Sequence, residues 1–288
     1  MSSLAKELVE SGIHFGQRRS NWNPRMAPYI HTTRNQVHVI DVRETIKGLL
    51  LAKRFIQKLV AEGKDVCFVG TKRQARGSIE ARCGEAKMPY VTERWLGGTL
   101  TNFRTIRDRL RRLEELESLQ QSGEIRNYSK KMESQLTREQ KKIFRNLNGI
   151  RGMTKLPGAL VAIDTGREVN ALREARNLGI PTICLIDTDG NPELADIPIP
   201  GNDDSMRAID IVVRELCAAV TEGRSQRSES AATSGDRGED MRGDAAAETA
   251  PAGRRRSSRS QFRARGRADE ADTGTAPRSE AAPAVENA

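Results

Sequence analysis

Short, continuously apolar runs alternate with longer amphipathic segments, and this alternation limits the fold more than any other feature of the chain. The run at 66–70 has no charged side chain, as expected of a strand that is buried on both faces of a sheet. The preceding segment, 44–61, instead carries its apolar residues near helical spacing. On such patterns, strands are expected at 37–42, 66–70, 89–92, 159–164, 182–187 and 196–200, and helices at 44–61, 72–86, 168–178 and after 203–205. This order predicts an α/β fold with a parallel sheet flanked by helices.

A highly charged middle segment interrupts the alternation. From Phe103 onward, apolar residues recur at intervals of three or four, and a second set with helical spacing follows the glycine-containing turn at 121–123. Two narrow apolar stripes of this kind predict an inserted antiparallel coiled-coil helical hairpin. Such an arm either contacts a partner or is only a structural insertion, and the sequence leaves both interpretations open.

The C-terminal tail differs in composition from the rest of the chain. It is rich in Ala, Gly, Ser, Arg and acidic residues and has almost no large apolar side chain. Because such a segment cannot bury enough apolar surface to offset the entropy lost on ordering, we expect it to be disordered. The expected organisation is therefore two parts of an α/β domain at 1–102 and 156–224, the hairpin at 103–155 and the tail at 225–288.

The net charge of +9 lies in the part of the chain before the tail, since the tail contains equal numbers of arginines and acidic residues. An excess of positive charge on a folded body favours an anionic partner, with nucleic acid first and a membrane surface second. No apolar run approaches the ~18 residues that a membrane helix needs. The N-terminus also lacks the apolar region of a signal peptide, so a cytoplasmic location without a membrane partner is expected.

The segment 14–39 contains no acidic residue, but it contains four arginines, three spaced aromatic residues and all three histidines of the chain. Arginines neutralise phosphates, and aromatic rings stack on bases or riboses. The segment therefore predicts a surface that binds RNA. The residues expected to contact RNA here are Arg18, Arg19, Trp22, Arg25 and Arg34.

Two further basic sites lie at predicted helix starts. Lys72 and Arg73 follow the apolar run at 66–70, where backbone N–H groups and the helix dipole favour a phosphate. The glycine-rich loops of nucleotide-binding enzymes are missing, which makes an RNA phosphate the better candidate. At the base of the arm, the stretch 94–112 contains six arginines and a single acidic residue. Trp95 in this stretch is explained equally well as an RNA contact or as a core residue. The arginines expected to face RNA there are Arg94, Arg104, Arg107 and Arg111.

Asp187 and Asp189 are the best evidence for an enzyme. An apolar strand that ends in Asp-x-Asp-Gly is typical of haloacid-dehalogenase-like phosphatases, in which one Asp is the nucleophile. The pattern lies on a late strand, however, and a polar turn explains it better. A third interpretation is a protein-interaction scaffold that uses the arm without RNA.

Ligand-binding patterns are otherwise missing from the sequence. The spacing of His14, His31 and His38 matches no common zinc pattern, and the four cysteines form no Cys-x-x-Cys pair. Cys67 and Cys184 lie in apolar runs and are expected in the core. We therefore expect no catalytic residue, metal, cofactor or small-molecule substrate.

Eight separated motifs carry a family resemblance. They are HFG at 14–16, WNPRM at 22–26, FVGTKR at 68–73, RWLGGTLTN at 94–102, LPGAL at 156–160, NLGIP at 177–181, IDT at 186–188 and IPGNDD at 199–204. In this order they resemble the family of bacterial ribosomal small-subunit protein two, over about Leu4 to Arg227.

This resemblance implies a flavodoxin-like α/β domain with an inserted coiled-coil hairpin and no catalytic activity. It further implies binding to small-subunit ribosomal RNA and to other small-subunit proteins, near the place where the large first protein of the subunit docks. One departure is Gln17, where the family commonly has a histidine. Any metal that some members bind through that histidine is less expected here.

Overall fold

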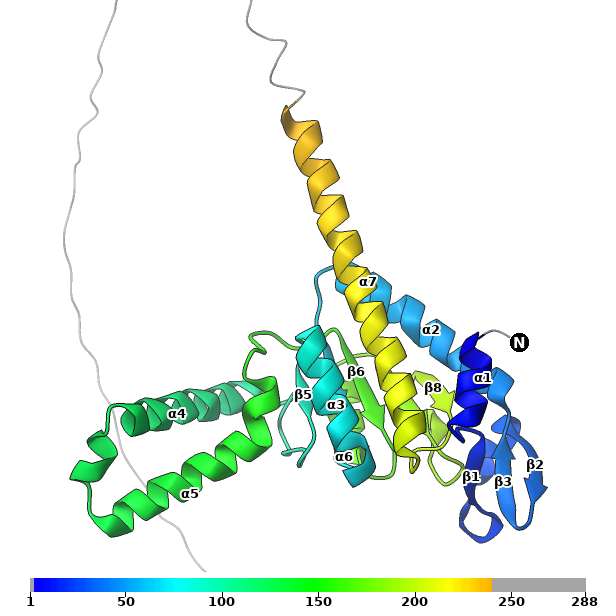
Figure 1. Cartoon of the computed structure of the whole chain (residues 1–288), viewed down its shortest axis with the longest axis horizontal. Helices are drawn as coiled ribbons and strands as arrows, with labels where there is room; N and C mark the ends of the chain where they lie inside the picture. The colour runs from blue at the N-terminus through cyan, green and yellow to red at the C-terminus, as the bar shows by residue number, and fades with distance from the viewer. Residues whose placement is uncertain (1–2, 240–288) are drawn as a thin grey trace, which may run out of the picture. The chain divides into compact units, whose positions relative to one another are not determined.

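The computed structural model describes residues 3–239 and contains a five-stranded parallel sheet (Figure 1). The order of the strands is β5-β4-β6-β7-β8, and every neighbouring pair is parallel. Their bounds are Val66–Val69 for β4, Tyr90–Val91 for β5, Ala159–Ile163 for β6, Thr182–Ile186 for β7 and Ile197–Pro200 for β8. The predicted parallel sheet is confirmed, in an order consistent with a flavodoxin-like fold.

Side chains alternate between the two faces of this sheet, so the sheet separates two apolar cores. In β4, Val66 and Phe68 belong to one core, whereas Cys67 and Val69 belong to the other. Helices α2 (Val42–Ala61), α3 (Arg73–Ala86) and α7 (Met206–Glu239) pack into the first core. Helix α6 (Val169–Asn177) packs into the second. Cys67 and Cys184 are buried in this second core, as the sequence predicted.

A second, antiparallel sheet was not predicted. Strands β1 (Phe15–Arg18), β3 (Val37–Ile40) and β2 (Ile30–Arg34) form it in that order, after the short helix α1 (Ser3–Glu10). The two-residue turn between β2 and β3 consists of Asn35 and Gln36, with φ angles of 51° and 63°. Residues with left-handed backbone conformation fit a tight hairpin turn. The sequence did not predict this turn because Asn-Gln is not the Asn-Gly pattern typical of such turns. The strand expected at 37–42 therefore belongs to this sheet and not to the parallel one.

Two long helices project from the β5 edge of the sheet (Figure 1). Helix α4 covers Phe103–Gln121 and α5 covers Lys130–Leu147, and the two helices contact each other. Between them lie Gly123, with a φ angle of 77°, and a short 3-10 helix, η3 (Glu124–Asn127). Another 3-10 helix, η4 (Asn148–Ile150), follows α5 and contacts β5. The α4/α5 pair is called the arm below.

The last helix is longer than expected. α7 begins after Ser205, whose hydroxyl accepts a hydrogen bond from the amide of Ala208, and it continues to Glu239. It therefore extends past the boundary near 225 where composition predicted a disordered tail. The remainder of that predicted tail, 240–288, lies outside the described residues. No helix within 3–239 has the length and apolar character needed to cross a membrane.

Candidate nucleic-acid interface

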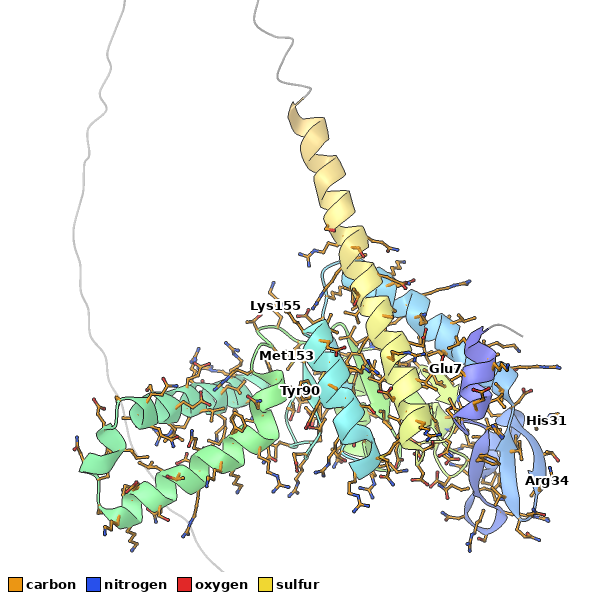
Figure 2. The ribbon with its side chains drawn as sticks, viewed as in Figure 1. Glu7, His31, Arg34, Tyr90, Met153 and Lys155 are labelled. Atoms are coloured by element: carbon orange, nitrogen blue, oxygen red, sulfur yellow. The ribbon has the colours of Figure 1, made fainter. Side chains whose placement is uncertain are left out.

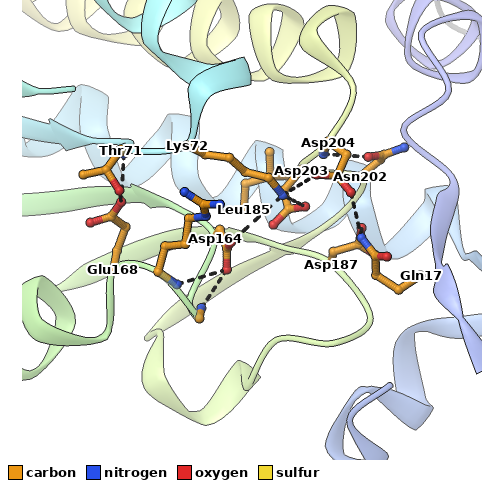
Figure 3. Close-up of polar contacts among 12 residues, drawn as sticks. Gln17, Thr71, Lys72, Asp164, Glu168, Leu185, Asp187, Asn202, Asp203 and Asp204 are labelled. Carbon is orange, nitrogen blue, oxygen red and sulfur yellow. Dashed lines mark hydrogen bonds and ion pairs between the residues drawn. The ribbon is translucent and has the colours of Figure 1, made fainter. Parts of the chain in front are cut away.

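The loops at the carboxyl ends of the parallel strands bring one lysine together with several carboxylates (Figure 3). Lys72, which follows β4, is buried, and its Nζ lies 2.6 Å from Asp203 Oδ1 and 2.6 Å from Asp204 Oδ1. Asp164 Oδ2 lies 4.0 Å from the same nitrogen. We call this group the carboxyl-edge cluster; its members are Lys72, Asp164, Asp187, Asp203 and Asp204. The expectation that Lys72 holds an RNA phosphate does not fit this geometry, because its charge is already neutralised inside the protein.

Burial changes the protonation of this cluster. Desolvation raises the pKa of Asp203 to about 7, even though the hydrogen bond from Lys72 acts in the opposite direction. Desolvation likewise raises the pKa of Asp187 to about 6. Burial would lower the pKa of Lys72, but its hydrogen bonds to Asp203 and Asp204 outweigh that effect and raise it. The ammonium is therefore charged at neutral pH and needs no external anion.

The carboxylates of Asp187, Asp203 and Asp204 lie within 4.8 Å of one another and are the group that could hold a metal ion among residues 3–239. The protein supplies its own donors to them. Besides Lys72, the side-chain amide of Gln17 donates to Asp187 Oδ2 at 3.2 Å and to Asp204 Oδ2 at 2.8 Å. Each of the three carboxylates thus already has an internal hydrogen-bond donor.

The start of α3 is occupied in a similar way. The amide and the hydroxyl of Thr71 donate to Glu168 Oε1, at 2.8 and 2.6 Å. Glu168 is buried, and desolvation raises its pKa. In an α/β sheet the crevice between β4 and β6, where the strand order reverses, is the usual ligand site. Here the chain fills that position with its own carboxyl group, and only Arg73 remains exposed at the helix start.

The loop at 94–102 is also held by an internal carboxylate, that of Glu174 on α6. This carboxylate accepts hydrogen bonds from Trp95 Nε1 at 3.1 Å, from the amide of Gly98 at 2.8 Å and from the amide of Leu100 at 3.0 Å. Trp95 is buried, so its core interpretation is the one that fits. Sequence reasoning missed Glu174, because charged residues between apolar ones are normal in an amphipathic helix and do not single it out.

The phosphatase interpretation fails on geometry. Asp187, the candidate nucleophile, is 2% exposed and accepts hydrogen bonds from Gln17 and from the amide of Thr188. A carboxylate nucleophile has to be ionised and open to its substrate. Asp187 is not open to a substrate, because it is buried and its oxygens already accept hydrogen bonds.

Unlike the buried Lys72, several arginines of the three-stranded sheet are exposed. Arg18 of β1 and Arg34 of β2 both lie directly opposite Val37 of β3, so the two arginines lie in one row across the sheet. Residues directly opposite one another point to the same face. Figure 2 shows His31 and Arg34 on the side of β2 away from the parallel sheet. Arg18, Arg19 and Arg34 are exposed and form no ion pair among the described residues; we call them the N-terminal basic face.

Trp22 and Arg25 lie beside this face with part of their surface already in use. The Trp22 ring packs against His38, with 5.1 Å between the ring centroids, and Trp22 remains 37% exposed. Arg25 forms an ion pair with Glu193 at 3.1 Å, and both side chains are more than half exposed. An exposed pair of this kind contributes little free energy and exchanges easily for a phosphate.

The predicted arginines at the base of the arm fall into two groups. Arg94 and Arg104 are exposed and form no ion pair in the part of the chain that the structure describes. Arg107 donates to the carbonyl oxygen of Met153 at 3.1 Å, and Arg111 pairs with Asp108 at 3.3 Å. Sequence reasoning missed Lys141, Lys142 and Arg145 of α5, which lie at the same place together with Arg76 of α3. Chain folding brings them there from outside the basic stretch at 94–112.

These features define a class of α/β protein. Its exposed cations suit a polyanion, and the crevice where α/β proteins usually bind a ligand is filled by the protein's own side chains. The sequence model of the ribosomal protein S2 family matches residues 8–223. The chain belongs to this family.

Three relatives illustrate the similarity, and each bears the name small ribosomal subunit protein uS2. The relative from Rhodopirellula baltica is 53% identical over 231 residues, which cover 80% of this chain and 89% of that protein. The one from Mycobacterium bovis is 46% identical over 222 residues, or 77% of each chain. The one from Mycolicibacterium gilvum is 43% identical over 235 residues, covering 82% of this chain and 84% of the relative.

Proposed function

We propose that this chain, a structural and non-catalytic constituent of the small ribosomal subunit, binds ribosomal RNA through the N-terminal basic face and the base of the arm. Family membership supports the first part. The observation that carries the second part is the row formed by Arg18 and Arg34, which are exposed and unpaired within residues 3–239. Two exposed guanidinium groups on one face of a sheet are suited to contact phosphates of an RNA backbone.

Further contacts surround these two surfaces. Trp22 stacks or wedges against RNA with the part of its ring that His38 leaves open. Arg25 exchanges Glu193 for a phosphate, and Arg73 contributes its charge from the start of α3. At the base of the arm, the contacts come from Arg94, Arg104, Arg107 and Arg111. Lys72 is left out of this interface because Asp203 and Asp204 neutralise it.

The arm is proposed to be a coiled coil that reaches neighbouring components. Helix α4 buries Ile106, Leu110, Leu113 and Leu116, spaced by four and three residues as in a coiled-coil seam. Arg112 Nε on α4 lies 3.7 Å from Glu139 Oε1 on α5, which is the type of pair that flanks such a seam. The proposed protein partners are other small-subunit proteins, including the large first protein of the subunit.

The test is a double charge reversal on the N-terminal basic face. Arg18→Glu with Arg34→Glu should weaken association with small subunits about tenfold or more at moderate salt, because two phosphate contacts become repulsive. Sedimentation of the full chain with small subunits in a sucrose gradient measures this. The matched control reverses Arg54 and Arg173, which are exposed, unpaired among the described residues and carried by α2 and α6.

Co-sedimentation of the Arg18/Arg34 variant at the level of the unaltered chain would contradict the proposed face. Equal loss in the Arg54/Arg173 control would show a general charge effect instead. Treatment with ribonuclease before the gradient separates RNA binding from a scaffold that holds only proteins.

A further inference from the structure

A groove follows the junction between the arm and the edge of the parallel sheet. Its floor is fixed where η4 packs on β5, because a Cβ added at Gly149 would overlap both the carbonyl and the ring of Tyr90. Tyr90 marks this junction in Figure 2. Two hollows of about 340 and 560 Å³ lie along it and share Glu93, Arg145 and Asn146. We call the two together the junction groove.

One end of the junction groove is aromatic. Phe144 of α5 is 46% exposed and lines the first of these hollows. Tyr90 lines the same hollow, together with Glu80 and two residues with amide side chains, Asn146 and Asn148. A ring for stacking and amides that both donate and accept hydrogen bonds are the groups that recognise an unpaired nucleobase.

The other end of the junction groove is cationic. It is lined by five cations and one carboxylate, Glu93, which accepts from Arg76 at 3.0 Å and from Arg145 at 2.6 Å. Hydrogen bonds from these arginines keep the pKa of Glu93 low, so the carboxyl group is ionised and fixes both guanidinium groups. Arg94, Lys141 and Lys142 have no such partner within the described residues and remain available.

We propose that the junction groove binds a short unpaired stretch of ribosomal RNA. A base stacks on Phe144 at the aromatic end, and the adjoining phosphates contact Arg94, Lys141 and Lys142 at the cationic end. The inference rests on the proposed function, since it assumes that the chain is in the small subunit, and it adds the class of RNA and the residues that read it.

The chemistry of the groove favours RNA over an acidic peptide. An acidic peptide would bind to the cations alone, without a contact to the exposed Phe144 ring or the two asparagines. Stacking on an aromatic ring contributes roughly 1–3 kcal/mol per base, and it requires a base that is free of a duplex. The combination of ring, amides and cations in adjoining hollows therefore selects a single strand.

The experiment uses the full chain assembled into small subunits, with a photoreactive phenylalanine analogue at position 144. Irradiation should cross-link this position to an unpaired nucleotide of the ribosomal RNA, which primer extension locates. The matched control places the analogue at position 128, where Tyr128 is equally exposed (47%) but lies between η3 and α5, outside the groove. The control should not label the same nucleotide.

Two variants complete the test. Lys141→Glu with Lys142→Glu should reduce the cross-link from position 144 several-fold, while the protein still sediments with the subunit through the N-terminal basic face. Phe144→Ala should raise the chemical reactivity of the cross-linked nucleotide, with the melting of the purified protein little changed because the ring is half exposed.

Cross-linking of position 144 to a protein, or to nothing, in subunits that contain the chain would overturn the inference. The same nucleotide labelled from position 128 would overturn it as well. A chain that does not sediment with the subunit at all contradicts the proposed function instead, so the two failures are distinguishable.

Discussion

Lys72 and Arg18 are both cations in motifs that predicted RNA binding, yet the fold gives them opposite environments. Lys72 is buried between Asp203 and Asp204, at 2.6 Å from each. Arg18 is exposed on a sheet of its own, in a row with Arg34 and without an ion pair in the part of the chain that is described. A positive side chain at a helix start is therefore a phosphate ligand only if the fold brings no carboxylate to it.

The same contrast extends to whole regions. At the carboxyl edge of the parallel sheet, Glu168 occupies the donors of Thr71, and on the loop at 94–102 Glu174 occupies the donors of Gly98 and Leu100. Groups that would bind an external anion in a nucleotide-binding α/β protein are used here to hold loops together. In the three-stranded sheet and at the base of the arm, by contrast, Arg18, Arg34, Arg94 and Arg104 are exposed and form no ion pair among the described residues. Under the proposed function, the first region serves structure and the second serves the recognition of RNA.

The largest effect that would break this comparison concerns Lys72. Lys72→Met should lower the free energy of unfolding by about 3–5 kcal/mol, because it leaves Asp203 buried without its partner. Chemical denaturation of the purified chain measures this. The neighbouring Arg73→Met, an exposed substitution, should change the same quantity by no more than about 0.5 kcal/mol. If Lys72→Met keeps its stability and instead loses RNA affinity, Lys72 belongs to the interface and the contrast fails.

Local signals in the sequence predicted the parallel sheet and the helices that flank it. The apolar runs at 159–164 and 182–187 are β6 and β7, and the Gly-Ile-Pro that follows Leu178 marks the end of α6. The three-stranded sheet was missed because its hairpin turn is Asn35-Gln36, and because exposed strands such as Ile30–Arg34 lack a continuous apolar run.

The internal partners of the predicted site residues were beyond sequence reasoning. Asp203 contacts Lys72 across 131 positions of the chain, and Glu174 contacts Gly98 across 76. Composition gives the sum of charges, but only chain folding decides which charges cancel. The basic excess of the folded part was therefore readable in the sequence, whereas its location on the surface was not.

A second, smaller effect sharpens the comparison through pH. Burial raises the pKa of Asp203 to about 7, against about 3.9 in an unfolded chain. Between these values the folded state holds a proton that the unfolded state has released, so stability contributed by this group falls as pH rises from 4 to 7. Asp203→Asn removes this titration. The unfolding free energy of the unaltered chain minus that of the variant should therefore fall by up to about 1.4 kcal/mol for each unit by which the pH rises between 4 and 7.

Asp204→Asn is the matched control for that titration. Hydrogen bonds from Lys72 and Gln17 outweigh desolvation and lower the pKa of Asp204, so its contribution is present above pH 4 and is lost in acid. The two variants should therefore diverge in opposite senses in denaturation curves recorded from pH 3 to 8. A difference for Asp203→Asn that rises with pH would mean that Lys72 keeps Asp203 ionised throughout.

The smallest effect is expected for the stability of an Arg18→Ala variant. A free energy of unfolding that hardly changes is the informative result here. Removing an exposed, unpaired guanidinium should leave the free energy of unfolding within about 0.5 kcal/mol. The same change should reduce the slope of log affinity against log salt by about one unit, since one phosphate contact disappears. Titration of the purified chain with small-subunit ribosomal RNA at several salt concentrations measures the slope. An unchanged slope together with lost stability would place Arg18 in the structural class of Lys72, and the division between the two regions would no longer follow from exposure.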